Sequence, residues 1–258
     1  QLAKDGMRFT DANTPASVCT PTRYAFLTGR YAWRGRLKHG TLSPPEGALL
    51  IEEDLLTLPD YLQQQGYSTA HIGKWHQGDI EESFPHNQGF DFAAFPAHQQ
   101  VQLALMTEEA SRANNLFGWE PSLQDNSYEL DKTFKPVGMV TGLEGYKGKK
   151  AREVHMPAGH KWTQADYHEM NVRYQRQAVE QLEKLSEKDE PFYLQYWPLY
   201  PLNFVHDQTE NLSLNGGFHA EKLQLLDTWI GEFFDKIDDL GIADNTLVVL
   251  MADNGLMY

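Results

Sequence analysis

The stretch YSTAHIGKWHQG, residues 67–78, decides how this chain folds. Tyr67–Ile72 predicts a short β-strand, because it combines apolar and β-branched residues and begins directly after Gly66. Gly73–Gly78, GKWHQG, then follows at the carboxyl end of that strand. Loops in this position carry the active sites of many α/β sheets, so this loop is a first candidate for function.

Alternating helices and strands surround this stretch. Helices are predicted where apolar residues recur every three to four positions, and glycine follows several of them as a stop. The predicted elements are a helix over 21–29, a helix over 54–65, the strand 67–72, a helix over 165–188, a strand over 192–197, a helix over 218–240 and a strand over 246–252. This order predicts an α/β fold with a mostly parallel central sheet flanked by helices.

The last predicted strand, Thr246–Ala252, is continuously apolar. A strand of this kind suits a central position in a sheet, where helices cover both faces. Asp253, Asn254 and Gly255 follow it directly. That combination is typical of a simple turn, and it also suits a polar site at the end of a strand.

Residues 79–161 lack a clear period and are rich in glycine, proline, asparagine, histidine and aromatic residues. We interpret them as a long excursion over the active-site face, not as a separate domain. Trp119, Tyr128 and Trp162 are candidate surfaces for stacking a substrate, although packing against the core would explain them equally well.

Composition and charge restrict the partners of the chain. Its 258 residues contain 22 Lys and Arg against 36 Asp and Glu, which gives a formal charge of −14. This balance argues against a nucleic-acid or anionic-membrane surface, because such surfaces need clustered cations. Cys19 is the only cysteine, which excludes an internal disulfide and a cysteine-rich zinc site. No apolar run is long enough to span a membrane.

Both ends of the sequence predict an internal piece of a longer protein. The chain begins without an initiator methionine or a signal segment, and Gln1–Gly6 has the pattern of a last helical turn that stops at glycine. It ends at Tyr258, shortly after Asp253, where an α/β enzyme would normally continue.

The sequence Cys19-Thr20-Pro21-Thr22-Arg23 lies where a polar loop meets the helix predicted over 21–29. A lone cysteine is usually a small buried apolar residue. Here a helix N-terminus, with Arg23 one turn further on, would instead favour a thiolate or a bound anion. Lys74 and His76 leave the predicted strand end together, although each alone would most often contact solvent.

Together, these motifs resemble those of the sulfatase family. The Cys-x-Pro-x-Arg pattern, followed by Leu27-Thr28-Gly29-Arg30, is similar to the signature whose cysteine is oxidised to formylglycine. The GKWHQG loop resembles the second signature, with Gln77 where an apolar residue is usual. Asp253-Asn254-Gly255 matches a metal-binding stretch of the family, and the resemblance covers nearly the whole chain.

The resemblance implies an alkaline-phosphatase-like fold that is incomplete at both ends. Residues 1–258 would form part of one catalytic domain, with about 79–161 inserted on its active-site face. The implied reaction is hydrolysis of sulfate esters by hydrated formylglycine at position 19. One of its hydroxyls would attack sulfur, and the second would expel sulfate and restore the aldehyde.

The resemblance also assigns roles to single residues. Arg23 and Lys74 would steady position 19 and the sulfate, and His76 would handle a proton during sulfate release. The cofactor would be calcium, with magnesium as the alternative, because oxygen ligands favour these cations over zinc. The implied metal ligands are Asp253, Asn254 and Cys19 in its formylglycine form.

The chain departs from the family pattern in three respects. The resemblance places two more metal-binding aspartates before the first residue and a lysine after the last, so these 258 residues alone are expected to be inactive. A histidine is also expected after the proline in the loop that follows residue 197, but Pro201 is followed by Leu202. His206 would either replace that histidine or simply be exposed.

Three other functions stay open. A phosphonate monoester or phosphodiester hydrolase would use the same architecture and formylglycine chemistry. A pseudoenzyme would bind anions without turnover, which Leu202 favours and the retained motifs oppose. A thiol hydrolase using Cys19 and His76 directly leaves Pro21 and Asp253 unexplained. For a sulfatase, the implied partners are a sulfated small molecule or glycan and a formylglycine-generating maturase, and the family suggests a periplasmic or secreted location.

Overall fold

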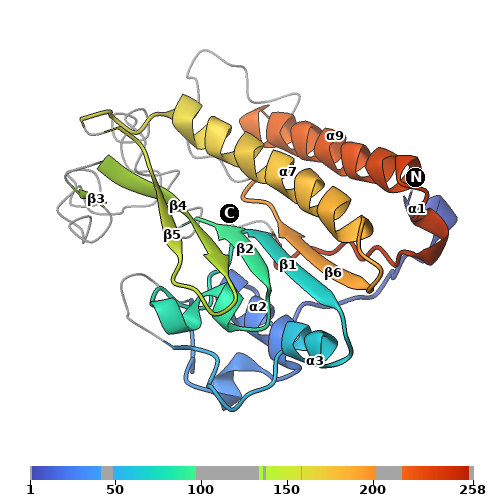
Figure 1. Ribbon diagram of the computed structural model, residues 1–258, viewed down its shortest axis with the longest axis horizontal. Coiled ribbons are helices and arrows are strands. Elements are labelled where there is room, and N and C mark those ends of the chain that lie inside the picture. The colour runs from blue at the N-terminus through green and yellow to red at the C-terminus, as the bar shows by residue number, and fades with distance from the viewer. Residues whose placement is uncertain are drawn as a thin grey trace.

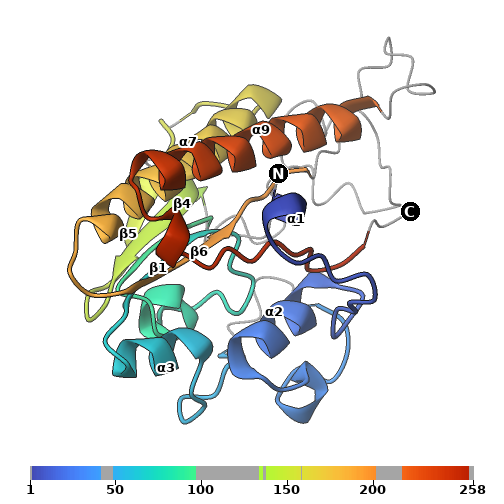
Figure 2. The same cartoon turned by 90° about the vertical axis from the view of Figure 1, so that its right-hand side faces the viewer.

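The computed structural model describes residues 2–41, 49–96, 134–135, 138–157, 159–201 and 217–255. A β-sheet lies between two layers of helices, which confirms the predicted α/β class (Figure 1). Figure 2 shows α7 (Gln164–Ser186) and α9 (Gly217–Asp239) on one side of the sheet, and α2 (Cys19–Thr28) and α3 (Leu58–Gln64) on the other. The shorter helices are α1 (Leu2–Asp5), η1 (Ala32–Arg34), η2 (Glu81–Ser83), η3 (Pro85–Asn87) and η5 (Ala243–Asn245).

In the described ranges the sheet has six strands, in the order β3, β4, β2, β1 and β6, with β5 paired to β4. They are β1 (Ser68–Gly73), β2 (Phe92–Phe95), β3 (Phe134–Lys135), β4 (Gly138–Tyr146), β5 (Arg152–His155) and β6 (Phe192–Trp197). Strand β1 is parallel to β2 and β6, whereas β4 is antiparallel to β2, β3 and β5. The sheet is therefore mixed, with its parallel part around β1.

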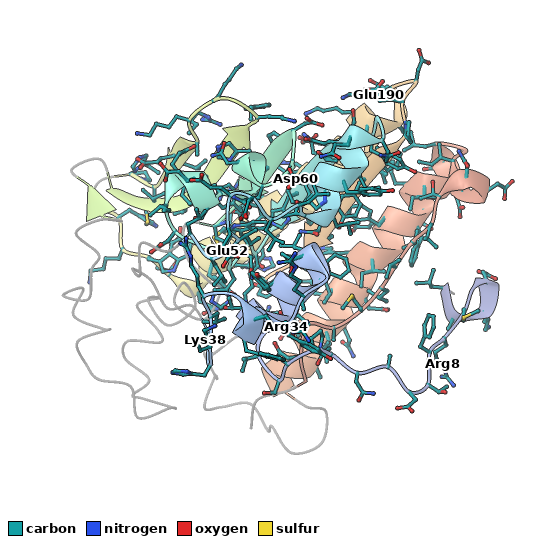
Figure 3. All side chains as sticks on the ribbon, turned by 90° about the horizontal axis from the view of Figure 1, so that it is seen from below. Arg8, Arg34, Lys38, Glu52, Asp60 and Glu190 are labelled. Carbon is teal, nitrogen blue, oxygen red and sulfur yellow. The ribbon has the colours of Figure 1, made fainter. Side chains whose placement is uncertain are left out.

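Two helices begin with a capping box, and one of these boxes corrects a predicted boundary. The Thr163 hydroxyl accepts from the Asp166 backbone N–H, and the Asp166 carboxylate accepts from the Thr163 N–H, which starts α7. Thr57 and Asp60, the latter labelled in Figure 3, make the same exchange at α3. Because Thr57 has extended backbone angles, α3 starts at residue 58 and not at 54 as predicted.

The sheet buries apolar side chains on both faces. On the α7 and α9 side, Ile72 and Ala94 pack with a cluster that includes Tyr167, Tyr174 and Trp229. The opposite cluster lies towards α2, and its buried members include Tyr24, Leu27, Trp75, Phe90, Ala93 and Phe95. Adjacent residues of β2, Ala93 and Ala94, thus belong to different clusters, as the alternation of side chains along a strand requires. Burial on both faces fixes the position of β1, whose end carries the candidate loop.

The stretch 79–161 is more regular than predicted. Its described parts contain β2, β4 and β5, and β4 and β5 extend the sheet in an antiparallel direction. Trp162 is 6% exposed within the cluster on the α7 side, so it packs in the core and does not offer a stacking surface. Trp119 and Tyr128 lie outside the described residues.

The prediction of a buried strand over 246–252 was wrong. This segment follows η5 without regular secondary structure, and Figure 2 shows it as a coil that runs from the end of α9 towards α2. Leu247 is 90% exposed and Val249 is 67% exposed. A central strand needs neighbours for its backbone N–H and C=O groups, and the described residues pair no strand with this segment. Apolar composition alone therefore misidentified its surroundings.

No helix among the described residues is both long enough and apolar enough to cross a membrane.

Candidate active site

Three segments that are distant in sequence meet near the carboxyl end of β1. They are the first two turns of α2, the loop 74–77 that follows β1, and Asp253. The predicted residues Arg23, Lys74, His76 and Asp253 are thereby brought together. The fold thus assembles residues that the sequence places up to 230 positions apart.

Arg23 joins two of these segments. Its Nε and Nη2 donate to Asp253 Oδ2 at 2.9 and 2.7 Å, and its Nη1 donates to the Lys74 carbonyl oxygen at 2.8 Å. The guanidinium lies 4.5 Å from the centre of the Trp197 ring. Flat stacking and several fixed donors are properties of arginine that lysine lacks. Arg23 therefore holds the loop after β1 and the carboxylate of Asp253 in one arrangement.

Lys74 is a buried cation beside the predicted nucleophile. The side chain is fully buried, and its Nζ has no hydrogen bond to an oxygen or nitrogen within the described part of the chain. Burial is the main cause that lowers the pKa of Lys74, to about 8, and the positive charge of Arg23 adds to it. Cys19 and Asp253 act in the opposite direction. A buried ammonium of this kind is suited to an anionic ligand.

Asp253 is held ionised by its cationic neighbours. Partial burial would by itself raise the pKa of Asp253, but the charges of Arg23 and Lys74 and the hydrogen bonds from Arg23 lower it below its ordinary value. Charge compensation by two cations is the reason that the carboxylate persists in this part-buried position.

His76 lies against the first turn of α2. Its Nε2 is 3.2 Å from the Thr20 hydroxyl oxygen, and the residue is 8% exposed with a φ of 60°. Positive φ is uncommon for a residue other than glycine, so the surrounding contacts hold this conformation. Gln77 contributes, because its Nε2 donates to the carbonyl oxygens of His76 and Thr20 at 2.8 and 3.0 Å. The polar residue at position 77 thus ties the loop to α2.

Cys19 is the first residue of α2 and is partly buried. The preceding Val18 provides no side-chain cap for the helix. Backbone N–H groups at an uncapped helix start attract negative charge. Cys19 therefore lies at the helix start and close to the ammonium of Lys74, and both groups would stabilise an anion at this position.

The possible metal ligands fit a hard cation in kind but not in number. Asp253 contributes a carboxylate, and the Asn254 side-chain oxygen is buried without a hydrogen-bond partner among the described residues. Both are oxygens, as calcium and magnesium require. Over the described ranges, no group of three or more His, Cys, Asp or Glu side chains is arranged to hold a metal. Asp253 and Asn254 alone would therefore supply only part of the ligand set of such a cation.

The motifs did not reveal every residue of this site. Thr20 and Trp197, which contact His76 and Arg23, are missing from the sequence prediction. Thr20 lies inside the Cys19–Arg23 motif, and Trp197 ends a predicted strand, so both could have been found by position alone. Leu202 and His206 lie outside the described residues.

Comparison with known proteins gives a consistent result. A family model described as Sulfatase matches residues 1–258. Arylsulfatase A of Homo sapiens is 32% identical over 263 residues, which cover 99% of this chain and 46% of that protein. An N-acetylgalactosamine-6-O-sulfatase of Bacteroides thetaiotaomicron is 26% identical and covers 99% of this chain and 53% of its own length. The chain therefore spans about half the length of these relatives.

Among solved structures, the PsFucS1 sulfatase from Pseudoalteromonas sp. is similar in fold. The superposition has a TM-score of 0.65 at 23% identity, and it covers 87% of this chain and 43% of that one. This likeness confirms the predicted alkaline-phosphatase-like fold for the part of the fold that the chain represents.

Proposed function

This chain belongs to the sulfatase family, and we propose that the protein hydrolyses sulfate esters with a nucleophile made from Cys19. The observation that carries the proposal is the arrangement of Arg23, Lys74 and Asp253 around the start of α2. In a chain with a formal charge of −14, the two cations Arg23 and Lys74 exceed the one carboxylate of Asp253 and leave positive charge beside one residue. A sulfate monoester is an anion, and such a site would attract it locally.

Position 19 would act in its oxidised form. A maturase would convert the Cys19 thiol to formylglycine, whose hydrate supplies a hydroxyl nucleophile that the thiol lacks. The helix start and the ammonium of Lys74 would stabilise negative charge that develops on this residue and on the sulfate. Arg23 would keep Lys74 in place through its bond to the Lys74 carbonyl.

Proton transfer is assigned to His76. Its imidazole lies against Thr20, the neighbour of Cys19 in sequence, so it is close to the predicted nucleophile. Histidine suits this role because its pKa lies near neutral pH in water. We assign it the proton that moves during sulfate release.

Calcium, with magnesium as the alternative, is the proposed cofactor. Asp253 and Asn254 would hold it together with the oxygen at position 19, and the buried, unpartnered oxygen of Asn254 supports this assignment. When bound, the cation would polarise the sulfate and lower the pKa of the attacking hydroxyl.

Sulfated small molecules or glycans are the proposed substrates. The relatives include arylsulfatases, a steryl-sulfatase and an N-acetylgalactosamine-6-O-sulfatase. Their names share the sulfate group and differ in the alcohol that carries it. We therefore propose the sulfate group, and not one particular alcohol, as the feature that this site recognises.

The test compares Cys19→Ala with the parent protein in its longest natural form, produced with and without the maturase. Mass spectrometry of the peptide around Cys19 measures its conversion to the aldehyde, and an aryl sulfate measures turnover. We expect turnover only from the converted parent, with a loss of several orders of magnitude in the variant. Turnover of Cys19→Ala within about tenfold of the parent would refute the proposal. An aryl phosphonate assayed in parallel separates the sulfatase from a phosphonate hydrolase.

A further inference from the structure

Three polar side chains line up on the face of the sheet that points towards α2. His71 of β1 lies directly opposite Gln195 of β6 in the parallel pairing, and Tyr193 lies two residues before Gln195 on the same face. His71 is fully buried and Gln195 is 4% exposed. The tyrosine hydroxyl donates to Gln195 Oε1 at 2.8 Å, and Gln195 Nε2 is 2.8 Å from His71 Nδ1. His71 Nε2 is 3.1 Å from the Gly73 carbonyl oxygen.

The direction of every hydrogen bond in this row follows from its last member. The Gly73 carbonyl can only accept, so His71 Nε2 carries the proton. Burial, the main cause, lowers the pKa of His71 to about 3, so the ring is neutral near pH 7 and Nδ1 is an acceptor. Gln195 must then donate through its nitrogen, which leaves its oxygen to accept from Tyr193. One assignment of protons therefore allows all three hydrogen bonds to form at the same time.

The row ends on the peptide group that precedes Lys74. The carbonyl of the Gly73–Lys74 peptide accepts from His71, and its N–H donates to the Trp197 carbonyl at 2.8 Å. Both ends of this peptide are therefore fixed. The carbonyl of Lys74 itself accepts from Arg23. The backbone on both sides of the Lys74 α-carbon is held, which sets the direction in which its side chain leaves.

Gly73 explains why this peptide needs external support. Its φ is +101°, and a Cβ at this position would lie 2.0 Å from the Trp197 carbonyl oxygen. Glycine is therefore required where the chain turns out of β1, and glycine restricts its own backbone less than any other residue. The hydrogen bonds from His71 and to Trp197 replace the restriction that a side chain would provide.

We propose that His71, oriented by Gln195 and Tyr193, is a positioning residue that fixes the Gly73–Lys74 peptide and thereby directs the Lys74 ammonium to the sulfate. This inference rests on the proposed function, because it assumes that Lys74 meets a sulfate. His71 itself acts through the backbone and does not touch the substrate. Simple core packing would not require the row, since Trp75, Phe90 and Trp197 already surround the ring.

Two substitutions at position 71 separate the hydrogen bond from packing. His71→Gln can place an amide nitrogen near the position of Nε2 and keep a donor for the Gly73 carbonyl, whereas His71→Leu removes the donor and stays apolar. We expect His71→Leu to lower kcat/KM on an aryl sulfate roughly 10- to 100-fold, which is the usual effect of removing a residue that orients a functional group. His71→Gln should stay within about fivefold of the parent.

His86 offers a matched control. It is also a buried histidine, but its Nε2 bonds to Glu81 and not to the loop after β1. His86→Leu and His86→Gln should both lower stability. Their kcat/KM values should be equal to each other, in contrast to those of the two His71 variants. If His71→Leu does not fold, Gln195→Met tests the same row, because it removes the donor to His71 Nδ1 at similar volume. That variant should also lower kcat/KM, by a smaller factor than His71→Leu.

A second readout does not depend on turnover. Calorimetric titration of the full-length parent with inorganic sulfate measures the anion site directly, and His71→Leu should weaken this affinity about tenfold while His71→Gln retains it. A parent that binds sulfate but hydrolyses no ester would refute the proposed function. The sulfate affinities of His71→Leu and His71→Gln would then still test whether His71 positions Lys74. Equal losses in His71→Leu and His71→Gln, no loss in a folded His71→Leu, or a parent without sulfate affinity would each overturn the inference.

Discussion

Arg23 shows how one residue connects the segments of the site. Its three hydrogen bonds reach Asp253 and the Lys74 carbonyl, and its flat face lies on Trp197. Each contact uses a different property of the guanidinium: a fork of donors, a third donor and a planar surface. A change at this position therefore affects the loop after β1 and Asp253 together.

Arg23→Lys is expected to lower kcat/KM on an aryl sulfate by roughly 100-fold, because a single ammonium cannot hold the three acceptor contacts at once. Arg36→Lys is the control, since Arg36 is exposed and, within the described ranges, its side chain donates to the Leu49 carbonyl oxygen and not to the site. Steady-state kinetics of both variants provide the measurement. Equal activity of the two variants would show that charge alone is sufficient at position 23.

His71 predicts an acid sensitivity of the folded state. Its pKa is lowered from 6.5 to about 3 by burial, so between these values the unfolded chain binds a proton that the folded chain does not. Stability rises with pH wherever the unfolded state binds more protons, so this contribution is complete above pH 6.5 and is lost as pH falls. Urea unfolding at about pH 7 and about pH 5 should show a loss that is roughly 2 kcal/mol larger in the parent than in His71→Gln. The same loss in both proteins would exclude His71 as its source.

Residues of the site differ in how well sequence predicts them. Cys19, Arg23, Lys74 and His76 lie in two short motifs, so sequence alone predicted that they belong to one candidate site. The pairing of His71 with Gln195 depends on two strands that are 124 positions apart. Neither residue belongs to a motif, and only the register of the parallel strands brings them together.

At the scale of elements, the central pair of strands was predicted closely. Strand β6 has the predicted bounds, 192–197, and β1 begins and ends one residue later than predicted. Both strands are short and are flanked by glycine or proline. These features can be recognised from a short stretch of sequence, so the bounds were predictable. The start of α3 was less predictable, because the capping pair Thr57 and Asp60 outweighed the apolar pattern that begins earlier.

The capping box of α7 leads to a prediction about stability. Thr163→Ala removes the acceptor for the Asp166 backbone N–H, and the free energy of unfolding should fall by roughly 1 kcal/mol. Thr228→Ala is the control, because Thr228 is exposed inside α9 and its hydroxyl donates to the Gln224 carbonyl oxygen one turn earlier, a bond that caps no helix end. Chemical denaturation measures both variants. A loss in Thr228→Ala as large as that in Thr163→Ala would contradict a specific effect of the cap.

At the scale of the whole molecule, sequence predicted the helix layers on both sides of the sheet better than the strands at the edge of the sheet. Alternating elements indicated an α/β fold, but the antiparallel strands β4 and β5 were interpreted as irregular chain. Strand β4 contains Gly138, Gly142 and Gly145, which weaken the signal of a strand, and β5 has only four residues. The error at 246–252 has the opposite origin, since an apolar run indicates a need for burial but does not specify a partner.

That segment carries the last prediction. Leu247, Val249, Leu250 and Met251 are between 50% and 90% exposed, and they lie in one run without a strand partner among the described residues. A short apolar run with unpaired backbone groups is a site for pairing with another chain. We therefore expect the 258-residue chain, purified alone, to associate with itself in a concentration-dependent manner.

The double variant Leu247→Lys with Val249→Lys should reduce this association, because two like charges would have to approach each other in every pair of runs. The control is Met7→Lys with Phe9→Lys, which changes two side chains that are also exposed, at 77% and 75%, but lie outside the run. Analytical ultracentrifugation over a range of concentrations measures the mass of each form. Self-association that responds equally to both double variants would assign it to exposed apolar area in general, whereas a parent that stays monomeric at every concentration would contradict the prediction.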